Sequence, residues 1–172
     1  MLAFDTSTII YAWDNHPPEQ FPGLWKGTMQ AFDTSTIIYA WDNYPPEQFP
    51  GLWRWMAKKV ESGEFVMLDV AFLEFKKKSL DLKEWLEDHK LRKFEITDAT
   101  IQNALMIKTL LGTENDKYGV GVGENDILII ASAKEHHIEL VTNESLQNKL
   151  PKEKRNIRFQ PYVICLRLRC HA

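Results

Sequence analysis

Cysteine and long apolar runs are scarce in this sequence, and each shortage excludes a class of protein. The chain has 172 residues and two cysteines, Cys165 and Cys170, so it carries neither a disulfide framework nor a cysteine-based zinc pattern. No apolar run approaches the roughly 20 residues that cross a membrane, and residues 1–20 lack the basic start of a signal peptide. We therefore expect a single-domain protein of the reducing cytoplasm, with no membrane partner.

Positive charge is not in excess either. The chain has 21 Lys and Arg residues against 24 Asp and Glu residues, a net charge of −3. This balance argues against a broadly basic nucleic-acid binder, although it leaves room for a local basic rim around an acidic site. The glycine-rich segment 119–123 lacks the Gly-Lys-Ser/Thr ending of a phosphate-binding loop. We predict that it belongs to a mobile loop over residues 112–123.

The sequence does contain a long internal repeat, in which residues 1–25 return as residues 29–53. The copies differ at only two positions, Leu2/Gln30 and His16/Tyr44. Two nearly identical copies are too few for a natural repeat array, and only the second continues into an unbroken helical pattern. We predict that the domain starts at Met29 and that residues 1–28 are a recent duplication, natural or introduced during cloning. This arm docks on its own domain or is swapped onto a partner in a homodimer.

Short apolar runs alternate with helical patterns through the rest of the chain. Buried strands are predicted at residues 31–32, 65–68 and 140–142, with a brief extended piece at 94–96. Helices are predicted at residues 49–60, 70–78, 80–91, 99–111 and 126–136. Asp69, Asp98 and Asp126 stand where N-caps are expected. This alternation predicts an α/β protein with a doubly wound parallel sheet flanked by helices.

Four acids stand out by their place in this pattern. Asp33 follows the first strand, Glu74 lies in the helix after the second strand, Asp126 opens the most apolar helix, and Glu144 follows the last strand. Strand carboxyl ends and helix amino ends share one edge of a parallel sheet. Two carboxylates 4 Å apart repel by about 4 kcal/mol at an effective dielectric near 20. Such clusters usually hold Mg²⁺ or Mn²⁺, which support phosphodiester hydrolysis.

Simpler roles fit the same residues. An acid at a helix start favours the helix dipole, so Asp126 also fits a capping role alone. Glu74 alone fits a solvated helix residue, and the hydroxyls of Thr34 and Ser35 fit caps for the helix after Asp33. The tryptophans fit core positions better than base-stacking positions. From the residues alone, the metal site and the capping roles both stay open.

Four segments in order resemble the motifs of the PIN domain. They are Asp33-Thr34-Ser35, the helix that carries Glu74, residues 124–133 with Asn125-Asp126, and residues 140–144 with Thr142-Asn143-Glu144. Residues 49–53, Phe-Pro-Gly-Leu-Trp, resemble one bacterial branch of that superfamily, which has been labelled only as a domain of unknown function. The resemblance covers residues 29–156.

The resemblance implies a PIN-like fold and a Mg²⁺- or Mn²⁺-dependent ribonuclease, often the VapC-type toxin of a toxin–antitoxin pair. RNA is then the substrate and a small antitoxin the protein partner. The implied metal ligands and catalytic residues are Asp33, Glu74, Asp126 and Glu144. Supporting roles fall to Thr34, Ser35, Asn125, Thr142 and Asn143, and Asp5 in the first copy is the alternative to Asp33. Glu144 is a departure, because most PIN domains carry Asp there.

The end of the chain is atypical for that branch, whose members tend to finish with a Lys-Ile-Pro-x-Val-Cys segment. A frameshift after Asn156 accounts for residues 157–172, and the two cysteines then have no evolved role. Two other functions are possible for such a chain. An aspartyl-phosphate phosphatase also places Asp after its first strand, but that chemistry needs a second Asp where Ser35 stands. The non-enzymatic alternative is a PIN-like interaction module whose site is degenerate.

Overall fold

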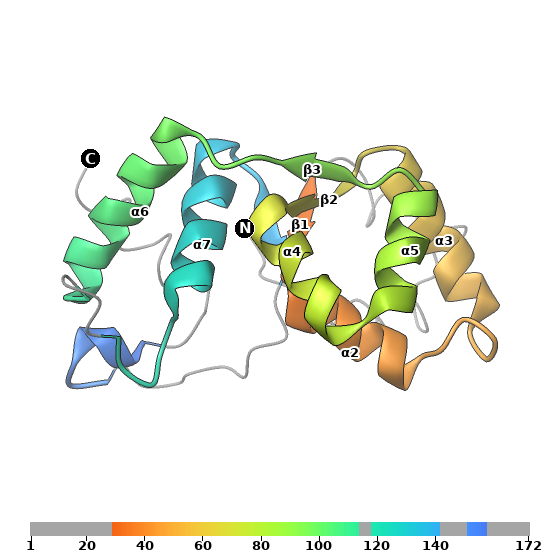
Figure 1. Cartoon of the computed structure of the whole chain (residues 1–172), viewed down its shortest axis with the longest axis horizontal. Coiled ribbons are helices and arrows are strands. Elements are labelled where there is room, and N and C mark those ends of the chain that lie inside the picture. Colours follow the sequence, from red (N-terminus) through yellow and green to blue (C-terminus); the bar gives the residue numbers. More distant parts are fainter. Residues whose placement is uncertain (1–28, 114–117, 142–150, 158–172) are drawn as a thin grey trace.

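The computed structural model describes residues 29–113, 118–141 and 151–157 (Figure 1). Its centre is a four-stranded sheet in the order β3-β2-β1-β4, and every neighbouring pair is parallel. The strands are β1 (Gln30–Phe32), β2 (Phe65–Leu68), β3 (Arg92–Phe94) and β4 (Glu139–Val141). The prediction of an α/β protein with a doubly wound parallel sheet is confirmed.

Helices cover this sheet on both sides. The α-helices are α2 (Thr34–Asn43), α3 (Pro50–Glu61), α4 (Asp69–Lys78), α5 (Leu80–Asp88), α6 (Asp98–Leu111) and α7 (Glu124–Glu135), followed by a 3₁₀ turn, η2 (Lys154–Asn156). In Figure 1, α6 and α7 stand to one side of the strands, α3 and α5 stand to the other, and α4 lies between them. Helix α3 packs on β2, and α7 contacts both β2 and β4.

The order of the strands contains one reversal. The chain passes outward from β1 to β2 to β3, and then returns through α6 and α7 to place β4 on the other side of β1. Phe32 at the end of β1 is therefore flanked by Met67 of β2 and Val141 of β4. In doubly wound sheets, ligands bind outside the carboxyl ends of the strands at such a reversal. The topology alone therefore makes Asp33, the residue after Phe32, a candidate for ligand binding.

Two helix starts differ from the prediction. Asp98 is the first residue of α6 and not its cap, because the Thr97 hydroxyl accepts a bond from the Thr100 N–H at 3.1 Å. The Thr100 hydroxyl in turn accepts a bond from the Thr97 N–H at 3.2 Å, which completes a capping box. Asp69 is likewise the first residue of α4, after Leu68 in the cap position. Both acids still lie in the first turn, where they favour the helix dipole.

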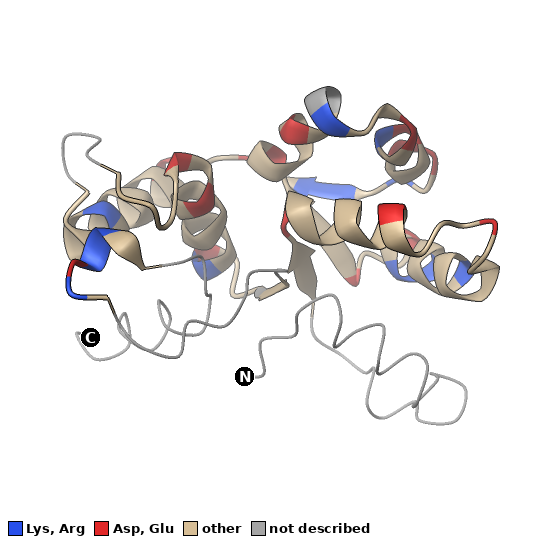
Figure 2. Cartoon of the chain, turned by 90° about the horizontal axis from the view of Figure 1, so that it is seen from below, with Lys and Arg blue, Asp and Glu red and all other residues tan. Residues whose placement is uncertain are grey.

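Other boundaries differ by two or three residues. Helix α7 begins at Glu124, so Asp126 is its third residue and not its cap. Helix α5 ends at Asp88, not at residue 91, because Lys90 adopts a positive φ of 57° that an α-helix does not continue through. The chain is then extended over Arg92–Phe94, two residues earlier than predicted. Strand β3 carries two exposed cations, Arg92 and Lys93, and is seen as the blue strand in Figure 2. Charged side chains of this kind protect the edge of a sheet from further pairing.

The described tryptophans are packing residues, as predicted. Trp53 and Trp55 are buried. The ring of Trp53 meets Trp41 edge-on at 4.8 Å and Trp85 at 5.0 Å, which joins α2, α3 and α5. Trp13 and Trp25 lie outside the described residues. This aromatic cluster stabilises the helices on one side of the sheet, away from the α4–α7 contact.

The glycine-rich segment packs closely where it is described. The Val122 N–H donates to the Ile157 carbonyl at 3.0 Å. A Cβ at Gly121 would lie 2.2 Å from that same oxygen, so no larger residue fits there. We predicted a mobile loop here. In the described part of that loop, Gly121 instead allows the backbone to approach the backbone of Ile157 closely. Residues 114–117 of the same loop lie outside the described residues.

Several predictions also fall outside the described residues. They concern the arm at residues 1–28 with Asp5, the strand end at Thr142, Asn143 and Glu144, and the tail from residue 158 with both cysteines. The domain limits therefore stay predictions. Within the described ranges, no helix is both long and apolar enough to cross a membrane.

Candidate functional site

Asp33 occupies the reversal between β1 and β4. Its backbone N–H donates to the Val141 carbonyl at 3.0 Å, which extends the pairing of these two strands by one step. Its extended backbone, with φ −73° and ψ 149°, makes it the residue at which strand becomes helix α2. The side chain is buried, with 8% of its surface exposed. Ser35, two residues on, donates its hydroxyl to Asp33 Oδ2.

The neighbouring hydroxyls fix the start of α2 in place. The buried Thr34 hydroxyl donates to the Ala71 carbonyl of α4 at 2.7 Å. The Thr36 hydroxyl donates to the Val141 carbonyl of β4 at 3.3 Å. Thr34 and Ser35 were expected as caps or as supporting residues. Neither caps α2, since Thr34 ties α2 to α4 and Ser35 holds the carboxylate of Asp33.

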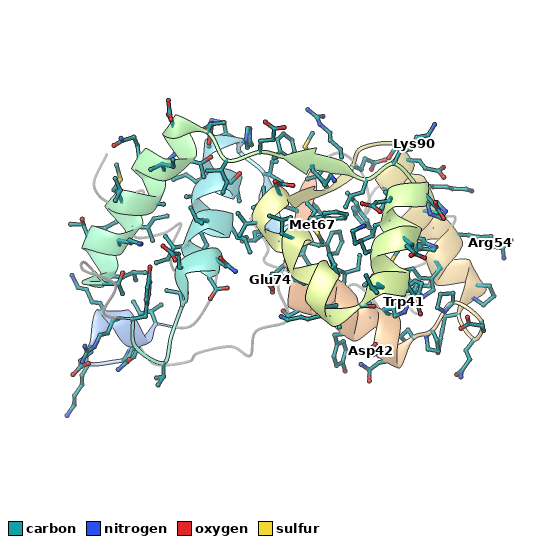
Figure 3. The ribbon with its side chains drawn as sticks, viewed as in Figure 1. Trp41, Asp42, Arg54, Met67, Glu74 and Lys90 are labelled. Atoms are coloured by element: carbon teal, nitrogen blue, oxygen red, sulfur yellow. The ribbon has the colours of Figure 1, made fainter. Side chains whose placement is uncertain are left out.

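Glu74 comes from α4 and is held by two groups. The Asn125 side chain of α7 donates to Glu74 Oε1 at 2.8 Å. The Lys78 ammonium, one turn further along α4, lies 3.3 Å from Glu74 Oε2. Figure 3 shows Glu74 on the side of α4 that faces α7. Asn125 and Glu74 are 51 residues apart in sequence. Their hydrogen bond therefore joins two of the predicted motifs, the helix that carries Glu74 and the helix start that carries Asp126.

Asp126 closes the first turn of α7. Its Oδ2 accepts a hydrogen bond from the Gly123 N–H at 2.7 Å, as a third helical residue does when it reaches back to the cap. Sequence reasoning left open whether Asp126 is a capping residue or a ligand. The capping bond is present, and the charge of Asp126 also acts on Asp33, so the two roles are compatible.

The pKa of Asp33 is affected by both of the other acids. Burial raises the pKa of the Asp33 carboxyl above its ordinary value, and repulsion from Asp126 and Glu74 raises it further. The hydrogen bonds from the Ser35 hydroxyl and the Thr34 N–H oppose this rise in pKa. A carboxylate in such a place is costly to charge. A bound cation would remove that cost.

The donor chemistry fits a hard cation, although the side chains are not gathered around one. Asp33, Glu74 and Asp126 offer only oxygens, which Mg²⁺ and Mn²⁺ prefer. Within the described ranges, no three acidic, histidine or cysteine side chains are close enough to form a ready metal site. Glu74 in particular is engaged by Asn125 and Lys78. The fourth predicted ligand, Glu144, lies outside the described residues.

Sequence reasoning did not assign two of these contacts. Lys78 pairs with Glu74, and this pairing was not predicted. The signal was available, because residues four apart on a helix are neighbours. Gly123 was read only as part of a loop, and its N–H is the partner of Asp126.

The fold and the candidate site together define the class of protein to which this chain belongs. This is a parallel α/β domain with a buried carboxylate at its strand reversal and two further acids acting on that carboxylate. A family model matches residues 30–169, so the chain belongs to that family, described as "Domain of unknown function (DUF4411)". The expected placement in a family with that label is confirmed. No curated protein matches the chain.

A solved structure is similar to the chain at a low level. It is the crystal structure of VapBC2 from Rickettsia felis bound to a DNA fragment from their promoter. The similarity has a TM-score of 0.44 and 20% sequence identity, and it covers 75% of this chain and 95% of that chain.

Proposed function

We propose that this protein is a divalent-metal-dependent ribonuclease that hydrolyses phosphodiester bonds of RNA. The observation that carries the proposal is the position of Asp33, buried at the strand reversal with Asp126 and Glu74 close enough to raise its pKa. A protein keeps such a repulsive arrangement where a cation offsets it. The sequence resemblance to PIN domains supplies the reaction class, and the same acids are those that the resemblance implies.

Each residue has a definite part in this proposal. Asp33, Glu74 and Asp126 would hold Mg²⁺ or Mn²⁺, with Glu144 as a fourth ligand. When bound, the metal supplies Lewis-acid stabilisation and lowers the pKa of a water molecule. Ser35 holds the Asp33 carboxylate by a hydrogen bond, and Asn125 holds that of Glu74. These second contacts fix the ligands before the metal arrives, which reduces the entropy lost on binding.

The decisive experiment is cleavage of labelled RNA with Mn²⁺ and then with EDTA, comparing the parent with Asp126→Asn. Asparagine keeps an oxygen that accepts from the Gly123 N–H, so the first turn of α7 stays intact. The charge that a hard metal needs is lost. We expect activity to fall at least about a hundredfold, the size of loss seen when one group that stabilises transition-state charge is removed. Equal cleavage by parent and variant, or cleavage in EDTA, contradicts the proposal.

The biological role follows from the resemblance and has its own test. VapC-type proteins are toxins, so induced expression of this chain should arrest bacterial growth, and Asp126→Asn should not. Co-expression of a small antitoxin would relieve the arrest. Normal growth with the active parent at matched expression would remove the toxin role and leave the ribonuclease chemistry standing.

A second candidate function is an interaction module with a degenerate site. It is favoured by one observation, that no ready metal site exists among the described residues. This candidate predicts no shift of the unfolding temperature by Mn²⁺ and no metal-dependent cleavage. The ribonuclease predicts both, so the two readouts separate the candidates.

A further inference from the structure

Glu74 is paired with a cation of the chain itself. The Lys78 ammonium lies 3.3 Å from Glu74 Oε2. The Lys78 side chain is 55% exposed and that of Glu74 is 27% exposed, so the pair stands at the rim of the site. The carboxylates of the site repel one another, and Lys78 places a positive charge against one of them.

We infer that Lys78 is an internal counter-ion, which occupies Glu74 in the metal-free protein and must leave when a divalent cation binds. The inference rests on the proposed function, because it concerns the affinity of that same site for metal. It adds a residue that sets this affinity and that is neither a ligand nor a catalytic residue. Lys78 stabilises the acids without metal and competes with the metal for one of them.

Electrostatics require the competition. An ammonium and a divalent cation on the same carboxylate repel each other, so both do not occupy Glu74 at full strength. The hydrogen bond from Asn125 carries no net charge and goes to the other oxygen, Oε1, so it is compatible with a bound cation. Of the two groups that hold Glu74, Lys78 is the one that has to move.

The position of Lys78 makes the movement inexpensive. It follows Glu74 by four residues on α4 and is the last residue of that helix, beside Ser79, whose backbone is extended. Its ammonium sits on a flexible four-carbon stem and is more than half exposed, so water replaces Glu74 as its partner at little cost. An exposed pair of this kind is weak in isolation. It is therefore suited to exchange and not to permanent structure.

The test is Mn²⁺ binding measured by calorimetry, together with thermal unfolding, for the parent, Lys78→Met and Lys78→Arg. Lys78→Met should bind Mn²⁺ about two- to fivefold more tightly, within the range that loss of a surface ion pair allows. Lys78→Arg keeps the charge and should stay within about twofold of the parent. The gain in Lys78→Met should shrink in 1 M salt, because the Debye length falls to about 3 Å.

Unfolding temperatures give a second readout that a merely structural ion pair would not produce. Lys78→Met should unfold at a lower temperature than the parent in EDTA, and the deficit should vanish in saturating Mn²⁺. The matched control is Lys83→Met, which removes another Lys–Glu pair at four-residue spacing, with Glu87 at 2.7 Å on α5. The control should leave Mn²⁺ affinity unchanged.

The outcomes separate this inference from the proposed function. If the parent binds Mn²⁺ and Lys78→Met binds it equally well or more weakly, the counter-ion role is wrong while the metal site stands. If Lys83→Met tightens binding as much as Lys78→Met, the effect belongs to net charge and the inference is also overturned. If the parent binds no Mn²⁺ at all, the proposed function fails and this inference fails with it.

Discussion

At the scale of single residues, the carboxyl group of Asp33 combines burial with repulsion. Its pKa is raised first by burial and then by Asp126 and Glu74, against hydrogen bonds from Ser35 and the Thr34 N–H. A group that is costly to charge in the folded state lowers the stability of the metal-free protein. Such a cost is common at functional sites, where stability is given up for activity.

This cost predicts that Asp33→Asn stabilises the metal-free protein at neutral pH. Because the folded pKa of Asp33 lies above its ordinary value of 3.8, its protonation favours the folded state below 3.8, and that contribution is lost as pH rises through the folded pKa. The advantage of Asp33→Asn over the parent in EDTA should therefore be small near pH 4 and grow toward pH 7. A change of about 1 kcal/mol would move the unfolding temperature of a chain this long by roughly 2–4 °C.

Thermal unfolding across this pH range, with EDTA present, checks the prediction. Asparagine retains an oxygen that accepts from Ser35, so the variant tests the charge and not the hydrogen bond. A parent that is as stable as Asp33→Asn at pH 7, or an advantage that shrinks as pH rises, would show that the charge of Asp33 is not costly in the folded protein.

At the scale of elements, the site is assembled where α4 and α7 meet. Each helix carries one acid, and the hydrogen bond from Asn125 to Glu74 crosses between them at 2.8 Å. The Thr34 hydroxyl binds α4 from the other direction, through the Ala71 carbonyl. Helix α4 is thus fixed from both α2 and α7, which places Glu74 relative to Asp33 and Asp126.

Removal of the cross-helix bond predicts weaker metal binding. Asn125→Ala frees the Glu74 carboxylate to rotate, while the ion pair between Glu74 and Lys78 remains. The metal must then order the Glu74 side chain when it binds, and this lowers its affinity. We expect Mn²⁺ affinity to fall about tenfold or more, the usual size of such an effect on a metal ligand. The measurement is calorimetric titration with Mn²⁺.

Asn43→Ala is the control for this variant. Asn43 donates one hydrogen bond of the same length, 2.8 Å, to the Tyr39 carbonyl at an exposed site on α2. Its loss should leave Mn²⁺ affinity unchanged. If both variants bind Mn²⁺ like the parent, Asn125 holds the two helices together without any role in positioning the ligand.

At the scale of the whole molecule, the sequence offers two copies of the segment that forms β1 and α2. The described structure places the second copy in the central position of the sheet, between β2 and β4. One of the two differences between the copies favours this choice. The Tyr44 ring packs against Phe49 at 5.3 Å, and the first copy has His16 at the equivalent position. The second copy also leads directly into α3, without an insertion.

This placement predicts that Asp33 and Asp5 behave differently although their surroundings in the sequence are identical. Mn²⁺ at 100 times its dissociation constant adds about 2.7 kcal/mol to the parent, which corresponds to roughly 5–10 °C in a chain of this size. Asp33→Asn should lose this increase, and Asp5→Asn should retain it. The reverse result would show that the first copy fills the sheet, and a partial loss in both variants would show that the copies exchange.

The sequence by itself determined the order of the elements and supplied the acids of the candidate site. Apolar runs such as Phe65–Leu68 and the helix starting near Phe49 are local patterns, so they carry their own structural signal. Asp33, Glu74 and Asp126 were predicted as a group because strand ends and helix starts share an edge in any parallel sheet. The caps at Thr97 and Gly123 were not found, because several neighbouring residues have similar capping preferences and only the actual hydrogen bonds distinguish them.

Only the tertiary structure decided which groups surround each acid. The strand order puts Asp33 between β2 and β4, and that order depends on long-range pairing which no local pattern encodes. The bond from Asn125 to Glu74 spans 51 residues, and it exists because α4 and α7 pack side by side. Asp33 is likewise buried by residues that are far away in the sequence, and this burial makes its charge costly. The residue types fixed the chemistry available to the site. The packing of the helices on the sheet fixed the distances between the acids and the repulsion between them.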